Sequence, residues 1–231
     1  MARPSLVALF RVVLLLSCVG VGAGLGQSPA AEKTKTQPLS SIAMPSDRAV
    51  DSYRIYSMLM PVGELGNEGW PHDLYLLEDT TVTLVEPDEP CWQSSETMNP
   101  HSALSAPAEQ AQDLAELLQD FDRHCHERIR LTADGFRLRV PLRLLNEAEQ
   151  NEFRQTRFSD KAPSELKTKY MGAPGLSSFS QIYFNAHHTV AMVYANGWCG
   201  GRCAQSFWAV YGLDKTGQWK PLRWNSDILM S

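Results

Sequence analysis

The feature that most constrains the fold is a run of four strand-like segments in the C-terminal third of the chain. Residues 179–185, 189–195, 206–213 and 218–224 are rich in apolar, aromatic and β-branched side chains and are separated by short loops. The last loop, Asp214-Lys215-Thr216-Gly217, places a glycine where a hairpin requires a positive φ. Short loops join antiparallel neighbours, so these segments predict an antiparallel β-meander of about four strands.

Two upstream segments, 46–60 and 107–128, have the 3- and 4-residue apolar periodicity of amphipathic helices, and a third, short helix is expected over 146–155. Ser46 is a candidate cap for the first helix, and Asn146 with Glu149 forms a capping-box pair at the start of the third. Further strand-like runs lie at 74–77, 81–85 and 136–144. Because strands and helices are segregated along the chain, the pattern predicts an α+β fold, with a few upstream helices packed on the meander.

The N-terminus has the three parts of a secretory signal peptide. Arg3 and Arg11 precede an apolar run of about ten residues, and small residues follow up to Gly26. We therefore expect residues 1–26 to be a signal peptide, 27–45 a flexible linker and 46–231 a single α+β domain. The apolar run is too short to span a bilayer. Leu15-Leu16-Ser17-Cys18 also resembles a bacterial lipobox, so the exported protein is either released, in the periplasm or outside the cell, or lipid-anchored at Cys18.

Outside this leader the chain holds four cysteines, and an even count in an exported protein favours disulfides. We expect Cys199 to pair with Cys203 across a tight loop, and Cys91 to pair with Cys125 on the long helix. A redox role for the first pair fits less well, because three residues separate the cysteines and strands flank them.

Four histidines form two short clusters, His124 with His126 and His187 with His188. The first lies at the end of the long helix, where residue 130 is an arginine and the His-Glu-x-x-His zinc motif is therefore incomplete. The second lies in a strand-to-strand loop. We expect surface histidines and no metal or other cofactor; zinc ligation by some of the four is the alternative.

Two tryptophans are poorly explained by packing alone. Trp198 follows Asn196-Gly197, a turn-like dipeptide, and Trp92 follows Cys91 in an irregular segment. Exposed tryptophans beside loops stack on ligands or on partner side chains. Trp198 and Trp92 are therefore the candidate binding residues.

Several short motifs resemble a widespread family of uncharacterised exported bacterial proteins. The motifs are Tyr56-Ser57 on the first helix, Ser180-x-Ile182-x-Phe184-Asn185, Ala191-Met192-Val193-Tyr194, Cys199-Gly200-Gly201-x-Cys203 and Lys215-x-Gly217-x-Trp219. The resemblance covers about residues 50–224 and departs after Cys203, where Ala204-Gln205 stand in place of further glycines. It implies an α+β fold and export, and it implies no activity.

The formal charge is −5, from 21 Lys and Arg against 26 Asp and Glu, and no basic block is present, which argues against a nucleic-acid partner. Phosphate-loop, Gly-x-Ser-x-Gly, zincin and EF-hand motifs are absent from the sequence. The sequence therefore favours an exported, non-enzymatic binding or interaction domain of the cell envelope without a transmembrane segment, whose partner is an envelope protein or a small ligand. The alternative is an envelope hydrolase or metal-assisted enzyme that uses the histidine clusters.

Overall fold

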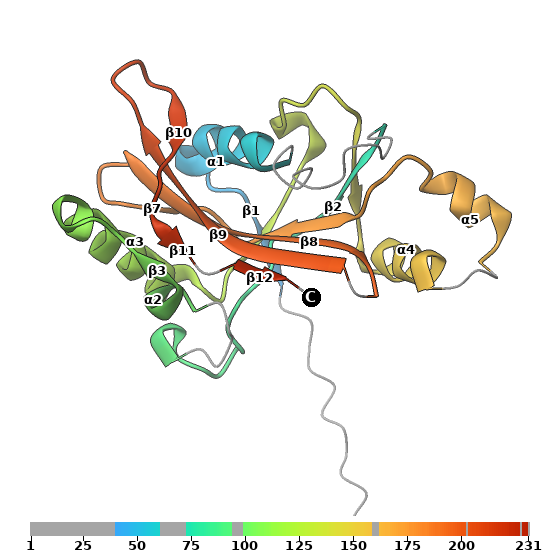
Figure 1. Cartoon of the computed structure of the whole chain (residues 1–231), viewed down its shortest axis with the longest axis horizontal. Coiled ribbons are helices and arrows are strands. Elements are labelled where there is room, and N and C mark those ends of the chain that lie inside the picture. The colour runs from blue at the N-terminus through green and yellow to red at the C-terminus, as the bar shows by residue number, and fades with distance from the viewer. Residues whose placement is uncertain are drawn as a thin grey trace, which may run out of the picture. The chain divides into compact units, whose positions relative to one another are not determined.

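A long antiparallel hairpin of β8 (Val190–Gly200) and β9 (Cys203–Leu213) lies at the centre of the fold (Figure 1). The computed structural model describes residues 40–60, 73–93, 99–158, 162–201, 203–226 and 228–230. Both strands are longer than the sequence predicts. Asn196-Gly197 is not a turn, because both residues pair with β6 and β9. The side-chain amide of Asn196 donates to the Ser178 hydroxyl, and its side-chain oxygen accepts from the Ser206 hydroxyl.

The main sheet has the strand order β10-β9-β8-β6-β2-β5, and β12 and β7 pair with β9 and β8 beside this path. Its other strands are β2 (Tyr75–Glu78), β5 (Leu142–Leu145), β6 (Leu176–Phe179), β7 (Tyr183–Phe184), β10 (Trp219–Pro221) and β12 (Ile228–Met230). The strands β8, β9 and β10 form the predicted antiparallel meander. The strand β2 pairs in parallel with β5 and β6, so the sheet is mixed and the fold is α+β.

Five α-helices lie around this sheet within the described residues: α1 (Ser46–Leu59), α2 (Pro100–Ala103), α3 (Ala111–His124), α4 (Glu147–Phe158) and α5 (Ser164–Lys169). Two small sheets complete the fold, β1 (Ser41–Ala43) with β4 (Arg128–Arg130) and β3 (Leu104–Ser105) with β11 (Asn225–Ser226). The described residues belong to one compact unit, which begins at Leu39.

The alternating side chains of β8 separate two cores. Ala191, Val193 and Ala195 pack with α1 on one face, and Val190 and Met192 pack with α3 on the other. A third apolar cluster lies under α4, where its members are Leu76, Leu145, Phe153, Tyr170, Ala173 and Leu176. The two main helices therefore cover opposite faces of the sheet, and α4 and α5 lie near one end of it (Figure 1).

Some local predictions are confirmed. The Asn146 side chain accepts from the Glu149 amide over 3.1 Å, and a Glu149 carboxylate oxygen accepts from the Asn146 amide over 3.3 Å, which is the predicted capping box of α4. Gly217 has a φ of 75° in the turn that follows β9. The extended run 136–144 also keeps its predicted apolar face, because Phe136, Leu138 and Val140 pack on the α1 core.

Other predictions are wrong. Ser46 is the first helical residue of α1 and makes no capping hydrogen bond, since Pro45 occupies the cap position. The run Thr81–Val85 is not a strand. Its first two backbone amides donate to different segments, Thr81 to the Ile129 carbonyl and Val82 to the Phe179 carbonyl. In the run 136–144, strand pairing begins only at Leu142, where β5 pairs with β2.

The predicted segment boundaries also differ at two places. The strand expected over 179–185 is interrupted between β6 and β7, where the Ser180 hydroxyl accepts from the Tyr194 amide. The expected linker 27–45 ends in β1, whose residues 41–43 pair with β4, so its last residues belong to the domain. The expected signal peptide, Cys18 and residues 27–39 of the expected linker lie outside the described residues.

Candidate functional site

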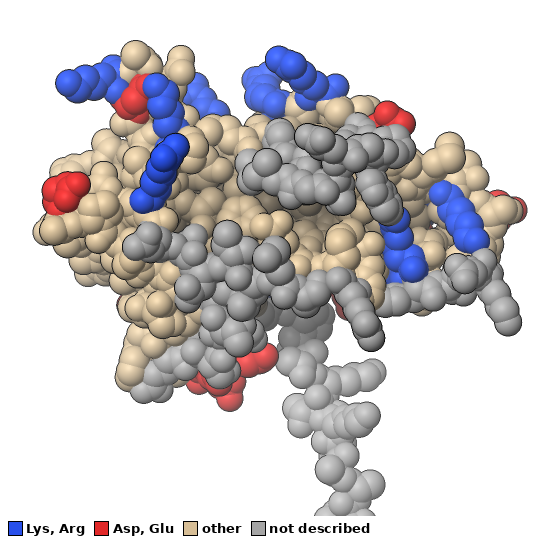
Figure 2. All heavy atoms as spheres, in the orientation of Figure 1, with Lys and Arg blue, Asp and Glu red and all other residues tan. Residues whose placement is uncertain are grey.

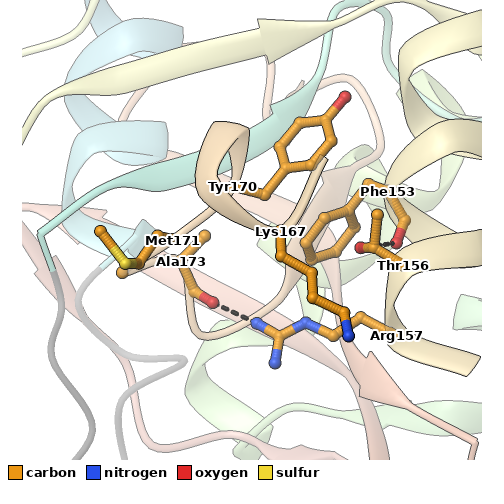
Figure 3. A pocket seen from close by; sticks show the side chains of 8 residues that line it. Phe153, Thr156, Arg157, Lys167, Tyr170, Met171 and Ala173 are labelled. Atoms are coloured by element: carbon orange, nitrogen blue, oxygen red, sulfur yellow. Dashed lines mark hydrogen bonds between the residues drawn. The ribbon is translucent and has the colours of Figure 1, made fainter. Parts of the chain in front are cut away.

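A cavity of about 390 Å³ opens between α4, α5 and the turn that follows α5 (Figure 3). Its lining residues are Phe153, Thr156, Arg157, Lys167, Tyr170, Met171, Gly172 and Ala173. All of them come from two sequence segments, and Phe153, Tyr170 and Ala173 also belong to the third apolar cluster. Ligand pockets in proteins have volumes of about 300–1,000 Å³, so the cavity is large enough for a small molecule.

Two helix ends and one turn bring these residues together. Phe153 and Thr156 lie in the second half of α4, whose start is fixed by the capping box. Gly172 has a φ of 84°, which glycine adopts at little cost, and its carbonyl oxygen accepts from the Asp73 amide beside β2. The turn is therefore held against the sheet, and Ala173 is buried behind the cavity.

The floor of the cavity is aromatic. Phe153 is fully buried and contacts Tyr170 edge-on, with ring centroids 5.2 Å apart. The Tyr170 hydroxyl donates to Glu152 over 2.8 Å, and Figure 3 shows it pointing away from Lys167 and Arg157. Burial raises the pKa of Tyr170, and the hydrogen bond to Glu152 raises it further, so this phenol stays protonated at neutral pH.

Two cationic side chains form one wall of the cavity. In Figure 3 Arg157 and Lys167 extend toward the same side, and basic side chains are visible at this end of the domain in Figure 2. Arg157 donates to the Ala173 carbonyl and lies over the Phe153 ring, 5.3 Å from its centroid. Burial lowers the pKa of Arg157 from its ordinary value, yet a guanidinium remains protonated in a protein.

Two carboxylates on α4, Glu149 and Glu152, form ion pairs with cations outside the lining. Glu149 accepts from Arg143, and Glu152 accepts from Lys169 over 2.6 Å. These contacts hold the pKa of Glu152 below its ordinary value, the hydrogen bond from Lys169 being the largest cause. No aspartate or glutamate is among the described residues that line the cavity.

The structure relates one predicted binding residue, Trp198, to this cavity. Trp198 lies in β8, paired with Leu176 and Ala204, and not in a loop as predicted. It is half-buried and contacts Phe153 edge-on, with ring centroids 6.0 Å apart. Trp198 therefore contacts the aromatic floor through Phe153 and is not itself among the lining residues.

The other predicted binding residue, Trp92, lies in the short 3-10 helix Cys91–Gln93 with 57% of its surface exposed. It is not among the residues that line the α4–α5 cavity. The structure does not bring Trp92 and Trp198 into a shared described pocket.

A second hollow of about 350 Å³ runs along β9. It is lined by Met58, Phe207, Trp208, Ala209, Val210, Tyr211, Pro221, Leu222 and Trp224. These residues are all apolar or aromatic apart from the Tyr211 hydroxyl, whose pKa burial raises to about 12. Its described lining therefore offers apolar contact without a charged or metal-binding group.

The histidines lie at two separate places. The His124 ring lies 3.5 Å from Asp120 and 3.0 Å from Glu127, and the His188 ring stacks on Phe184 with 4.8 Å between centroids. His187 is exposed in the turn before β8. Within the described part of the chain, the one group of three possible metal ligands contains His126 with two cysteines, so the four histidines do not form a shared site there.

Both predicted cysteine pairs are formed. Cys91 and Cys125 have Cα atoms 6.0 Å apart, and Cys199 and Cys203 have Cα atoms 5.2 Å apart. The first pair is buried between the 3-10 helix and the end of α3, and the second closes the β8–β9 turn. Disulfides are typical of proteins outside the reducing cytoplasm.

Reasoning from the sequence missed the residues Phe153, Arg157, Lys167 and Tyr170 of the α4–α5 cavity. A signal was present in part, because the capping box placed α4 correctly. The helix α5 was not expected, since none of its residues is buried and it has no apolar stripe. Without α5 the second wall of the cavity could not be placed.

Compared with family models, with curated proteins and with solved structures, the chain has no match. Among the described residues, no helix has both the length and the apolar character that crossing a membrane requires.

Proposed function

We propose that this protein is an exported, non-enzymatic binding domain of the cell envelope. Its ligand is a small molecule with an anionic group and an aromatic or apolar part, and it occupies the α4–α5 cavity. The observation that carries this proposal is the combination of Arg157 and Lys167 with an aromatic floor in one cavity.

The charge of the cavity selects the anionic group. Arg157 and Lys167 extend to the same side, and the neighbouring Glu149 and Glu152 are engaged by Arg143 and Lys169. Two cationic side chains on one wall favour an anionic group in the ligand through Coulomb attraction. A guanidinium also presents its donors in a plane that matches carboxylate and phosphate oxygens.

The apolar part of the ligand is selected by the other lining residues. Phe153 and Tyr170 offer aromatic surface, and Met171 is 74% exposed at the opening. A methionine side chain adapts its shape to different apolar groups. An aromatic or short aliphatic group would gain contact with these residues while the anionic group faces the cations.

The lining gives little support to a catalytic role. Of the usual proton-transfer groups and nucleophiles, the described lining holds Lys167, Tyr170 and Thr156, but no histidine, aspartate, glutamate or cysteine. The Thr156 hydroxyl donates to the Phe153 carbonyl over 2.7 Å. The alternative, a hydrolase or metal-assisted enzyme, would use histidines, and none lines either described cavity.

The paired cysteines and the leader-like N-terminus support the cellular location in this proposal. Export with removal of residues 1–26, or acylation of Cys18, would place the domain in the envelope. The N-terminal residue of the protein isolated from its native cells, read by mass spectrometry, tests this part of the proposal. An intact Met1 on the abundant form would contradict export.

Isothermal titration calorimetry with four matched probes tests the binding. All four probes contain one phenyl ring. Phenyl phosphate and benzoate are anions, benzyl alcohol is neutral and benzylamine is a cation. We expect saturable binding of both anions, tighter for phenyl phosphate, and none of benzylamine. Lys167→Gln should weaken phenyl phosphate by about three- to tenfold. Lys215→Gln, in the β9–β10 turn, is the matched control and should leave the affinity unchanged.

Three results would contradict the proposal. Absence of saturable binding of both anions is the first, and equal binding of benzylamine and phenyl phosphate is the second. The third is an equal effect of Lys167→Gln and Lys215→Gln, because the affinity would then reflect the overall charge of the domain rather than the cavity.

A further inference from the structure

Cys91, Cys125 and His126 place three potential metal-ligand atoms within 4.8 Å of one another. The sulfur atoms come from the 3-10 helix Cys91–Gln93 and from the C-terminal end of α3, so two elements distant in sequence form the cluster. Cys91 is 6% exposed and Cys125 is 1% exposed. Within the part of the chain that the structure describes, no other group of three such residues lies as close.

A second observation concerns the His126 ring. Its Nδ1 atom is buried and, among the described residues, has no hydrogen-bond partner. Buried ring nitrogens are normally hydrogen-bonded or bound to a metal ion. His124 Nδ1 is likewise buried without a hydrogen-bond partner, but its ring lies 3.5 Å from Asp120 and 3.0 Å from Glu127. Of these two described histidines, His126 is the one with no ion pair to a described carboxylate.

We propose that Cys91, Cys125 and His126 form a Zn²⁺ site when the Cys91–Cys125 disulfide is reduced. A dithiol supplies two electrons and two protons, breaks the S–S bond and becomes a disulfide itself. Zn²⁺ then displaces the two thiol protons and binds two thiolates and one neutral imidazole nitrogen. The fourth position of the tetrahedral ion is filled by water.

Charge and geometry support this site. Two thiolates balance the two positive charges of Zn²⁺, which lowers the cost of placing the ion in a buried environment. Thiolates and imidazole are the ligands that zinc prefers, and ligand atoms on a tetrahedral zinc lie about 3.5–4 Å apart. Reduction lets the sulfur atoms separate to this spacing, which lies within the 4.8 Å that already contains all three ligand atoms.

The packing keeps the ligands in place after reduction. Cys91 and Cys125 belong to the core that contains Leu117 and Phe121, both fully buried on α3. The end of α3 is also held by Gln181, whose side chain donates to the His124 carbonyl. The site is therefore held by contacts that do not depend on the disulfide, and it is separate from the α4–α5 cavity.

Cobalt binding by the full chain tests this site. Cys18→Ser, Cys199→Ser and Cys203→Ser leave Cys91 and Cys125 as the two thiols, which are counted after reduction with a phosphine. We expect one equivalent of Co²⁺ to give thiolate-to-cobalt charge-transfer absorption, which Zn²⁺ abolishes and which the oxidised protein does not show. His126→Gln should weaken Co²⁺ at least about tenfold. His124→Gln is the matched control and should leave the cobalt affinity unchanged.

Any of three results would overturn the site. The first is the absence of charge-transfer absorption in reduced protein whose circular dichroism is native. The second is an equal cobalt affinity in the parent and in His126→Gln. The third is loss of the native circular dichroism on reduction with Zn²⁺ present, because the ligands would then not stay together without the S–S bond.

Discussion

The hydroxyl of Tyr56 on α1 donates to the backbone carbonyl of Ser180 over 2.9 Å, across 124 positions of sequence. Tyr56 is fully buried, and its ring stacks on Phe179 at a centroid distance of 5.3 Å. Ser180 lies where β6 ends, and its hydroxyl accepts from the Tyr194 amide of β8. One tyrosine thus connects the first helix to the point at which the strand is interrupted.

Tyr56→Phe should lower the free energy of unfolding by about 1–3 kcal/mol, because the Ser180 carbonyl loses a buried donor. Tyr53→Phe is the comparison: Tyr53 also bonds to Thr132 through its hydroxyl, but it is 8% exposed and that contact is only partly buried. We expect a smaller loss there. Urea denaturation measures both, and a Tyr56→Phe loss no larger than that of Tyr53→Phe would contradict the account.

Two glycines near Trp198 should respond in opposite ways to alanine. A Cβ at Gly175 would lie 2.4 Å from the Trp198 carbonyl oxygen, whereas a Cβ at Gly197 would meet nothing within 4 Å. Gly175→Ala should therefore cost about 1–3 kcal/mol of stability. Gly197→Ala should be neutral or stabilising by about 0.5 kcal/mol. Thermal unfolding of the two variants checks this, and equal melting temperatures would show that β6 does not approach β8 this closely.

The features that the sequence predicts correctly are local. The Asn146–Glu149 capping box, the turn at Gly217 and the alternation from Phe136 to Leu144 each depend on residues a few positions apart. The sequence also predicts the two cysteine pairs, because the four cysteines after residue 26 allow few combinations.

The features that the sequence does not predict depend on distant partners. The strand β2 pairs in parallel with β5 and β6, which lie far along the chain, and nothing local indicates parallel pairing. Asn196-Gly197 has turn-like residues, but Ser178 and Ser206 bond to Asn196 within the sheet. The α4–α5 cavity needs Phe153 and Tyr170 to meet through a turn that the Asp73 amide holds.

The stability of the domain should depend on the ionisation of Glu78. Burial raises the pKa of Glu78 above 4.5, although the nearby Arg154 and Arg128 lower it in part. The folded state therefore binds this proton more tightly than the unfolded state, and the contribution of Glu78 to stability falls as the pH rises from about 4.5 through the folded pKa.

Glu78→Gln removes this pH dependence. It also removes the contact with Arg154, whose dependence on the ionisation of Glu78 is already part of the folded pKa of Glu78. The free energy of unfolding of Glu78→Gln minus that of the wild type should therefore rise as the pH increases from about 4.5 through the folded pKa of Glu78. Denaturant titrations at several pH values measure it. Glu86→Gln, at an exposed position, is the control, and a flat difference for Glu78→Gln would refute the prediction.

The two disulfides should differ in their effect on stability. Cys91 and Cys125 are 34 positions apart, and Cys199 and Cys203 are 4 positions apart. Chain-entropy estimates give a loss of about 3–4 kcal/mol for replacing the first pair with serines, and about 2 kcal/mol for the second. Chemical denaturation of the two double variants under oxidising conditions checks the order, and a larger loss for the Cys199–Cys203 pair would contradict it.

The most direct test of the binding function is the map of amide chemical shifts on titration with phenyl phosphate. The α4–α5 cavity predicts that perturbed amides concentrate in the second half of α4, in α5 and at Met171–Ala173. Benzylamine at the same concentration should leave them unmoved. Perturbations confined to Phe207–Tyr211 beside the apolar hollow, or spread evenly over the domain, would contradict the claim that the cavity of Arg157 and Lys167 is the ligand site.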